Sequence, residues 1–195
     1  MFEKYNEIYL KKDTYLKSQG RIYSLTSTNK MIGTIEETLE STKNIVNQLL
    51  NLITLFSVTS LELNVMDNKA KVLGTIKKEK GFYKDFLLFS SNGEHMATIK
   101  PTIKIKSPLM NVIDVNENNL IKAVGVYGAT DFSVIDCRTN KQISTIKRRS
   151  LVSTTIKENL LNDDGYYIDN TNQDSLTSFA LIAMSLIVDI YFFHK

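Results

Sequence analysis

The sequence predicts a mostly β protein: a closed antiparallel β-barrel of about twelve strands around a central apolar C-terminal helix. Two observations predict it, namely a hairpin pattern that occurs four times and one long apolar segment, 175–193 (SLTSFALIAMSLIVDIYFF), after many short strands. An antiparallel sheet must hide one face and its edges, and closure into a barrel does both. Because a barrel of that size is too wide for its own side chains to fill, an apolar helix is expected inside it.

The hairpin pattern combines an apolar strand, a polar turn, a Lys or Glu, an apolar residue, a small residue and a Thr-Ile pair. It occurs in 23–35 (YSLTSTNKMIGTI), 65–76 (VMDNKAKVLGTI), 88–99 (LFSSNGEHMATI) and 134–146 (VIDCRTNKQISTI). Each copy reads as a β-hairpin with a short loop. The small residue indicates a β-bulge or the close approach of another backbone, at Gly33, Gly74, Ala97 and Ser144.

Further elements lie between and after these hairpins. Segment 102–106 (TIKIK) alternates as a strand does, 110–115 and 120–126 form another hairpin, and 166–169 is a short last strand. Segment 38–54 has apolar residues at helical spacing, so we expect an amphipathic surface helix that crosses between strands.

The apolar helix has a second interpretation as a membrane anchor, because nineteen residues span roughly 28 Å. Asp189 interrupts it, and the uncharged stretch 175–188 has the length of a buried core helix. We therefore expect a buried central helix over 175–194, capped by Asp174 or Ser175. A buried Asp189 would need a hydrogen-bonding partner, and we expect it instead in water at the barrel mouth. The alternative is a tail-anchored membrane protein with a soluble β-domain.

The composition and net charge point to no particular class of partner. The chain has 195 residues, which we expect to form a single domain, and its net charge of +3 does not call for nucleic acid. Cys137 is the only cysteine, so no internal disulfide forms, and the first residues lack the apolar core of a secretion signal. We expect a cytoplasmic protein, and a monomer because a closed barrel has no free strand edge.

Five stretches carry a resemblance to a known family: LGTIKK (73–78), VGVYGATDFSVID (124–136), ISTIKRR (143–149), DGYYI (164–168) and the closing apolar helix. The chain resembles the LURP-one-related group of the tubby C-terminal-like superfamily, which also contains the phospholipid scramblases. The likeness covers 21–195 and implies one tubby C-terminal-like domain over 1–195, a twelve-stranded barrel around a C-terminal helix. It also implies a lipid-related role, although the family has no single activity.

Basic residues follow the repeated hairpins. If these strand ends lie side by side, they form one positive surface that holds a phosphate headgroup or an anionic membrane. The alternative is that they are solvated strand ends that protect the sheet from aggregation. The ligand-binding candidates are Lys77, Lys78, Lys100, Lys104, Lys147, Arg148 and Arg149, with Lys80 and Lys106 beside them.

No motif indicates catalysis, a cofactor or a metal. The chain lacks a nucleophile elbow, a phosphate-binding loop, a zinc-ligand pair and a dinucleotide fingerprint. Segment 169–180 (DNTNQDSLTSFA) faintly resembles a calcium loop, but Asp174 and Ala180 stand where that loop needs Gly and Glu. We therefore expect a non-enzymatic cytosolic module that binds an anionic lipid or phosphate headgroup, peripheral to the membrane when bound. A protein-interaction scaffold is a further alternative.

Overall fold

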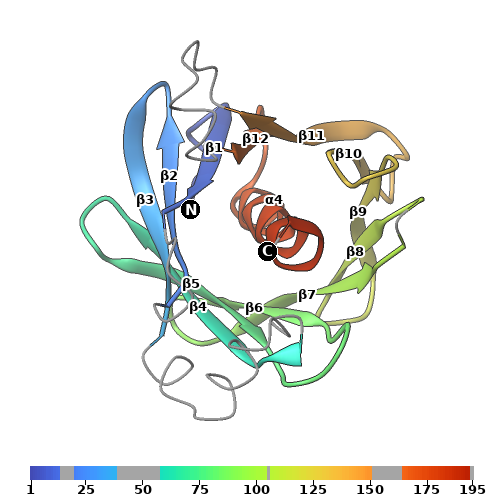
Figure 1. Cartoon of the computed structure of the whole chain (residues 1–195), viewed down its shortest axis with the longest axis horizontal. Coiled ribbons are helices and arrows are strands. Elements are labelled where there is room, and N and C mark those ends of the chain that lie inside the picture. Colours follow the sequence, from blue (N-terminus) through green and yellow to red (C-terminus); the bar gives the residue numbers. More distant parts are fainter. Residues whose placement is uncertain (14–19, 39–57, 105, 151–163, 194–195) are drawn as a thin grey trace.

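The computed structural model describes residues 1–13, 20–38, 58–104, 106–150 and 164–193. Within these residues, twelve antiparallel strands form a closed barrel around one helix, as the sequence predicts (Figure 1). The strands are β1 (Glu7–Lys12), β2 (Ile22–Ser27), β3 (Lys30–Glu37), β4 (Leu61–Asp67), β5 (Val72–Lys78), β6 (Phe86–Ser90), β7 (His95–Thr102), β8 (Leu109–Asp114), β9 (Asn119–Gly125), β10 (Asp131–Asp136), β11 (Gln142–Ser150) and β12 (Asp164–Asp169).

Each strand pairs with its neighbours in the chain, and β1 pairs with β12 to close the barrel. In this last pairing Leu10 lies opposite Tyr166, and both side chains are buried inside the barrel. Strand β1 was not predicted, although Ile8 and Leu10 show the two-residue alternation of a half-buried strand. The described strands therefore leave no free edge.

A β-bulge accompanies the small residue of each repeated hairpin, which confirms the interpretation of the pattern. The pairing register shifts directly beyond the positions of Gly33, Gly74, Ala97 and Ser144. A Cβ added at Gly74 would lie 2.7 Å from the Phe89 carbonyl oxygen and 3.0 Å from the ring of Phe179. A larger side chain there would displace the central helix, so the glycine lets the barrel wall approach it.

The central helix α4 (Ser175–Val188) fills the barrel, and a π-helical turn, η2 (Asp189–Phe193), continues it. Asp174 caps the helix by accepting a hydrogen bond from the Thr177 amide at 2.7 Å. Every residue from Ser178 to Val188 is buried. By length and composition Ser175–Phe192 could cross a membrane, but 72% of it is buried within the barrel.

One predicted element differs from the structure, and two others extend beyond the described residues. The described residues of segment 102–106 do not form a separate strand: Thr102 ends β7, and the Lys104 amide bonds to the Thr102 carbonyl at 3.2 Å. That local turn directs the chain toward β8, so the alternation of the apolar residues does not continue into a sheet. The predicted helix over 38–54 lies outside the described residues from residue 39 onward, as does the last residue of the predicted helix 175–194.

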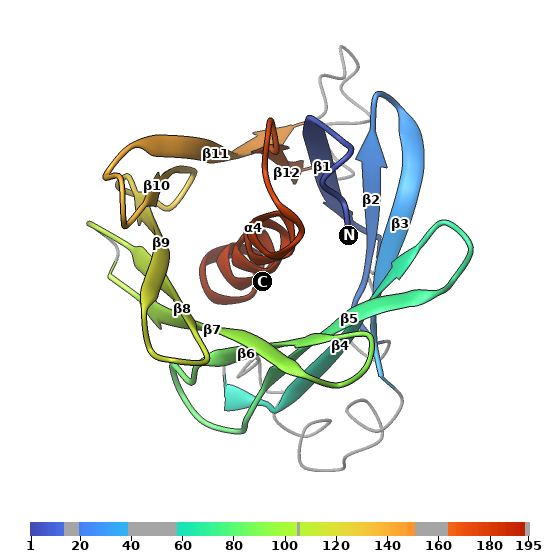
Figure 2. The same ribbon diagram turned by 180° about the vertical axis from the view of Figure 1, so that it is seen from behind.

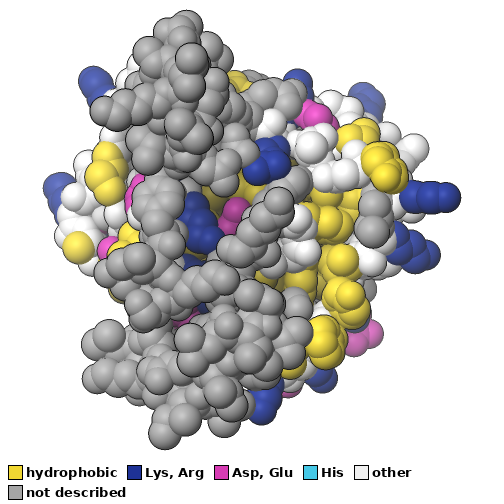
Figure 3. All heavy atoms as spheres, in the orientation of Figure 1, with side chains coloured by type: hydrophobic (Ala, Val, Ile, Leu, Met, Phe, Trp, Pro, Cys, Tyr) yellow, Lys and Arg dark blue, Asp and Glu magenta, His cyan; other side chains and the backbone are white. Residues whose placement is uncertain are grey.

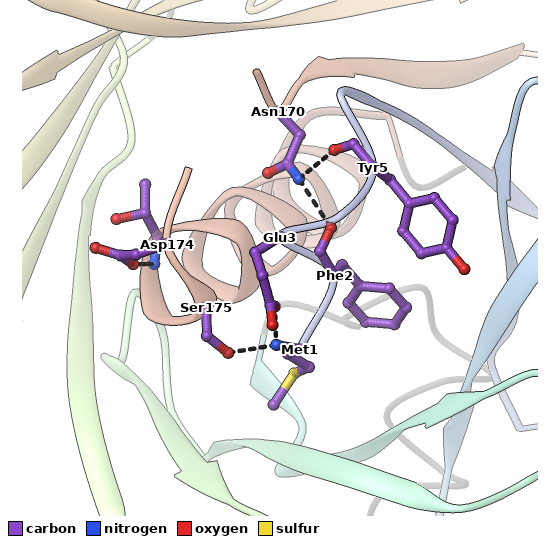
Figure 4. A network of polar contacts seen from close by, with 8 residues as sticks. Met1, Phe2, Glu3, Tyr5, Asn170, Asp174 and Ser175 are labelled. Carbon is purple, nitrogen blue, oxygen red and sulfur yellow. Dashed lines mark hydrogen bonds and ion pairs between the residues drawn. The ribbon is translucent and has the colours of Figure 1, made fainter. Parts of the chain in front are cut away.

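The barrel has two different ends. We call the end at which α4 begins the hairpin end, because the short turns after β2, β4, β6, β8 and β10 lie there (Figure 2). At this end Asn170 donates hydrogen bonds to the carbonyls of Phe2 (3.1 Å) and Tyr5 (2.7 Å), which fixes the first residues beside the start of α4 (Figure 4). The opposite end, where α4 finishes at Asp189, is called the mouth.

Aspartates organise three hairpin-end turns. Asp67 accepts hydrogen bonds from the Lys69 and Lys71 amides (2.8 and 3.0 Å). Asp114 and Asp136 bond in the same way to amides two to four residues further on. These backbone and side-chain hydrogen bonds favour the charged carboxylates, so they lower the pKa of Asp67, Asp114 and Asp136 below 3.8.

A chain truncated after Asp174 should not fold, because the barrel would lose the residues that fill it. Size-exclusion chromatography and circular dichroism in detergent-free buffer would test this against the full chain. A soluble, folded truncation beside a full chain that needs detergent would contradict it and favour a membrane anchor.

Acid should weaken the three aspartate turns. Their pKa is depressed in the folded state, so their stabilisation is present above pH 3.8 and is lost as pH falls through the lowered pKa values. Below about pH 4, the unfolding free energy of the wild type should fall more steeply than that of an Asp67→Asn/Asp114→Asn/Asp136→Asn variant. Urea unfolding between pH 3 and 7 measures this difference in slope. Glu94→Gln, in the turn organised by Ser90, is the control and should keep the wild-type slope.

Candidate functional site

The predicted basic residues gather at the mouth. Strands β5, β7 and β11 all end there, so Lys77 and Lys78, Lys100 and Lys104, and Lys147 and Arg148 are carried to the same end of the barrel. Figure 3 looks onto this end, where dark blue Lys and Arg side chains lie around the edge and yellow hydrophobic side chains lie between them. Arg149 is part of β11, and the structure describes its backbone alone.

These strand ends do not lie side by side. Strand β6 separates β5 from β7, and β8, β9 and β10 separate β7 from β11. The single positive surface expected from adjacent strands is therefore replaced by an arc of cations along the rim. Acids interrupt it, since Lys77 pairs with Glu62 at 3.2 Å and Lys147 lies opposite Asp131.

The end of β7 and the connection to β8 form a basic part of the rim. Residues 95–113 contain three lysines, Lys100, Lys104 and Lys106, and no Asp or Glu. All three side chains are exposed. Gly125 at the end of β9 donates its amide to the Pro108 carbonyl at 2.8 Å, which holds this connection against the neighbouring hairpin. A phosphate-bearing ligand at this position would meet positive charge without a competing carboxylate from this segment.

Lys78 faces inward, unlike the three rim lysines. It is 3% exposed, and its ammonium donates hydrogen bonds to the carbonyls of Thr59 (2.6 Å), Glu79 (3.2 Å) and Gly81 (3.3 Å). Burial, with the nearby positive charge of Arg21, lowers the pKa of Lys78 to about 8. This lysine fastens the connection between β5 and β6 to the end of the barrel wall.

A polar cluster inside the mouth was not predicted. Arg21 and Glu37 form a buried ion pair at 2.9 Å, with side chains 6% and 5% exposed. Lys12 lies nearby, and burial lowers its pKa while Asp189 opposes that shift. Every second residue faces inward along β1 (8, 10 and 12) and along β2 with the residue before it (21, 23 and 25). Strand parity could therefore have placed Lys12 and Arg21 in the interior.

Asp189 is the centre of this cluster. It accepts hydrogen bonds from the hydroxyls of Tyr23 (2.9 Å) and Tyr166 (3.3 Å), and the Lys12 ammonium lies 3.9 Å away. At 8% exposure it is buried, so the expectation of a carboxylate in water is wrong. It lies at the mouth but has the partners that a buried carboxylate requires. Burial and the Asp189 charge together raise the pKa of Tyr23 well above 10.

A groove on the mouth rim has mixed charge. It has a volume of about 380 Å³ and is lined by Ser60, Leu61, Glu62, Lys77, Lys78, Glu79 and Leu87. A second hollow of about 330 Å³ shares Glu79 and Leu87 with it and is also lined by Tyr83, Lys84 and Asp85. Because carboxylates line both, an anion is better accommodated by the acid-free 95–113 segment. Within the described residues, no group of three or more His, Cys, Asp or Glu side chains is placed to hold a metal ion.

Comparison with known proteins supports the fold. No family model matches the chain, and no curated protein matches it in sequence. Among solved structures it is similar to an X-ray structure of a protein from Arabidopsis thaliana, with a TM-score of 0.57 and 10% sequence identity. The likeness covers 96% of this chain and 96% of that chain. At this identity it shows the shared barrel and helix alone.

Tyr23→Phe should lower the unfolding free energy by about 1–3 kcal/mol, because the buried Asp189 carboxylate loses a hydrogen-bond donor. In Asp189→Asn, the same Tyr23 change should cost less, since a neutral amide needs that donor less than a carboxylate does. Urea unfolding of the two single variants and the double variant measures the coupling. Tyr127→Phe, 73% exposed, is the control. Strictly additive effects would contradict the cluster as described.

Proposed function

We propose that the chain is a non-enzymatic binding module whose mouth docks on a phosphate-bearing anionic ligand, foremost a lipid headgroup at the cytosolic surface of a membrane. The observation that carries this proposal is the acid-free segment 95–113, whose lysines are all exposed at one end of the barrel. Lys and Arg near an anionic membrane contribute about 1 kcal/mol each. Three such lysines contribute about 3 kcal/mol to the binding free energy, and salt weakens this contribution.

The contrast between the two ends supports an oriented interaction. The hairpin-end turns carry acids and bases together, such as Asp67 beside Lys69 and Lys71. By contrast, the exposed Lys100, Lys104 and Lys106 lie at the mouth in a segment without Asp or Glu. A charge distribution of this kind turns a protein in the field of an anionic surface so that the basic end approaches first. The ligand would then meet the rim.

The cations inside the mouth serve a different purpose in this proposal. Arg21 is paired with Glu37, Lys12 lies beside Asp189, and Lys78 bonds three carbonyls. These contacts hold the strand ends in fixed positions, and the exposed lysines make the ligand contact. The proposed binding residues are therefore Lys100 and Lys104, joined by Lys106, with Lys77, Lys147 and Arg148 contributing along the arc.

The resemblance to the LURP-one-related group supports a lipid-related role and a single tubby C-terminal-like domain, and membership of that group is part of the proposal. The sequence offers no catalytic motif, which supports a binding module over an enzyme. A single half-buried thiol, Cys137, suits a reducing cytosol, and a barrel without free strand edges suits a monomer.

Replacing Lys100, Lys104 and Lys106 with Ala should weaken binding to anionic vesicles on the order of 100-fold at low salt, since three cations are lost from the contact. Co-sedimentation with phosphatidylserine-containing and with pure phosphatidylcholine vesicles measures it. The matched control replaces three exposed hairpin-end lysines, Lys69, Lys71 and Lys141, and should bind as the wild type does.

Titration with inorganic phosphate separates a free anion from a lipid headgroup. Saturable phosphate binding that the rim variant loses, without vesicle binding, would assign a soluble ligand. Equal binding of neutral and anionic vesicles, or equal loss in both triple variants, would overturn the proposal.

A further inference from the structure

We infer that two aromatic-tipped loops on the mouth insert into the interfacial region of an anionic phospholipid bilayer on either side of the basic β7–β8 connection. The first loop is 79–85, between β5 and β6, and carries Phe82 and Tyr83. The second is 126–130, between β9 and β10, and carries Val126 and Tyr127. The inference rests on the proposed function, because the lysines between the loops supply the attraction that brings the surfaces together.

The four side chains are unusually exposed for their size. Phe82 is 58% exposed, Tyr83 57%, Val126 51% and Tyr127 73%. Phe, Tyr and Val normally bury much of their surface, and Tyr with an apolar ring and a polar hydroxyl is enriched where membrane meets water. Exposed aromatic residues at two loop tips indicate that they contact an apolar surface outside this chain.

Loop 79–85 holds its aromatic residues outward by specific contacts. Gly81 has φ +134° and donates its amide to the Val58 carbonyl at 2.8 Å, while Lys78 bonds the Gly81 carbonyl from below. Tyr83 adopts φ +51°, a conformation that costs a non-glycine residue about 1–2 kcal/mol. The centroid of its ring lies 6.0 Å from the ring centroid of Tyr191, at the end of the central helix. The loop is therefore already arranged, which reduces the entropy lost on binding.

Loop 126–130 is shorter and is also held by specific hydrogen bonds. The Ala129 amide bonds to the Val126 carbonyl at 3.0 Å, and the Val126 amide to the Asp131 carbonyl at 3.0 Å. The Arg148 amide bonds to the Thr130 carbonyl at 2.7 Å, which ties the loop to β11. Gly128 at φ +82° completes the turn, so Tyr127 lies at the tip.

The order of the loops favours a bilayer as the partner. Strands β5 to β10 are consecutive in the barrel, so the two aromatic loops flank the connection that carries Lys104 and Lys106. In Figure 3, yellow side chains lie along the right and lower right of the mouth beside dark blue ones. Apolar tips on both sides of a cationic stretch match a broad surface that is apolar inside and anionic outside.

The chain contains no tryptophan, so a single introduced tryptophan reports on one loop. Phe82→Trp and Tyr127→Trp place reporters on the two tips. Met31→Trp and Val115→Trp, at residues 54% and 57% exposed on the hairpin end, are matched controls. Each variant is mixed with phosphatidylserine/phosphatidylcholine vesicles that carry brominated acyl chains, after its thermal unfolding has been compared with that of the wild type.

Insertion predicts that the emission of both tip reporters shifts to shorter wavelength and is largely quenched, while the controls keep their solution spectra. A Phe82→Ser/Tyr127→Ser variant should also bind these vesicles roughly 100-fold less tightly, about tenfold for each aromatic ring withdrawn from the interface.

The outcomes separate this inference from the proposed function. Vesicle binding that depends on the rim lysines, but leaves both tip reporters unquenched, overturns insertion and leaves headgroup binding intact. Quenching of the hairpin-end reporters overturns the orientation. Absence of vesicle binding removes both proposals. Concentration-dependent self-association that shields the tip reporters without vesicles would assign the loops to a second copy of the chain.

Discussion

The width of the barrel is the constraint on which the rest of the structure depends. Twelve strands enclose more space than their own inward side chains fill, so the wall and α4 are stable only together. The wall adapts to the helix through small residues, as at Gly74, where the Phe179 ring takes the space that a Cβ would need. The helix in turn is buried almost completely, because only an apolar surface on every side packs against a closed wall.

The direction of the helix makes the two ends of the barrel chemically different. Its last carbonyls carry on the order of half a negative elementary charge, and Asp189 adds a full one at the mouth. Tyr23, Tyr166 and Lys12 surround that carboxylate, and the Arg21–Glu37 pair lies close by. The mouth is thus a polar region built around the end of an apolar core. The exposed lysines lie outside it, on β7 and its connection to β8, which the Gly125–Pro108 hydrogen bond holds in place.

Much of the fold could be predicted because it repeats. The small residue and bulge recur in four hairpins, and the apolar length of 175–193 indicates a helix that must be enclosed. Strand β1 was missed because it belongs to no repeat, and 102–106 was misassigned because five alternating residues do not reveal a turn at Thr102. The candidate site was harder to predict, because the adjacency of β5, β7 and β11 depends on topology. Strand parity from Ile76 could have placed Lys78 in the interior, as for Lys12 and Arg21.

The pairing of β1 with β12 has a consequence for how the protein is made. Every other pairing joins strands that follow each other in the chain, whereas this one joins residues 7–11 to 165–169. During synthesis on a ribosome, β1 emerges early and waits for a partner that is translated more than 150 residues later. The growing sheet has two open edges and an empty concave face until β12 and the helix leave the exit tunnel. Native assembly is therefore a late event, because the barrel cannot close before β12 and the helix are available.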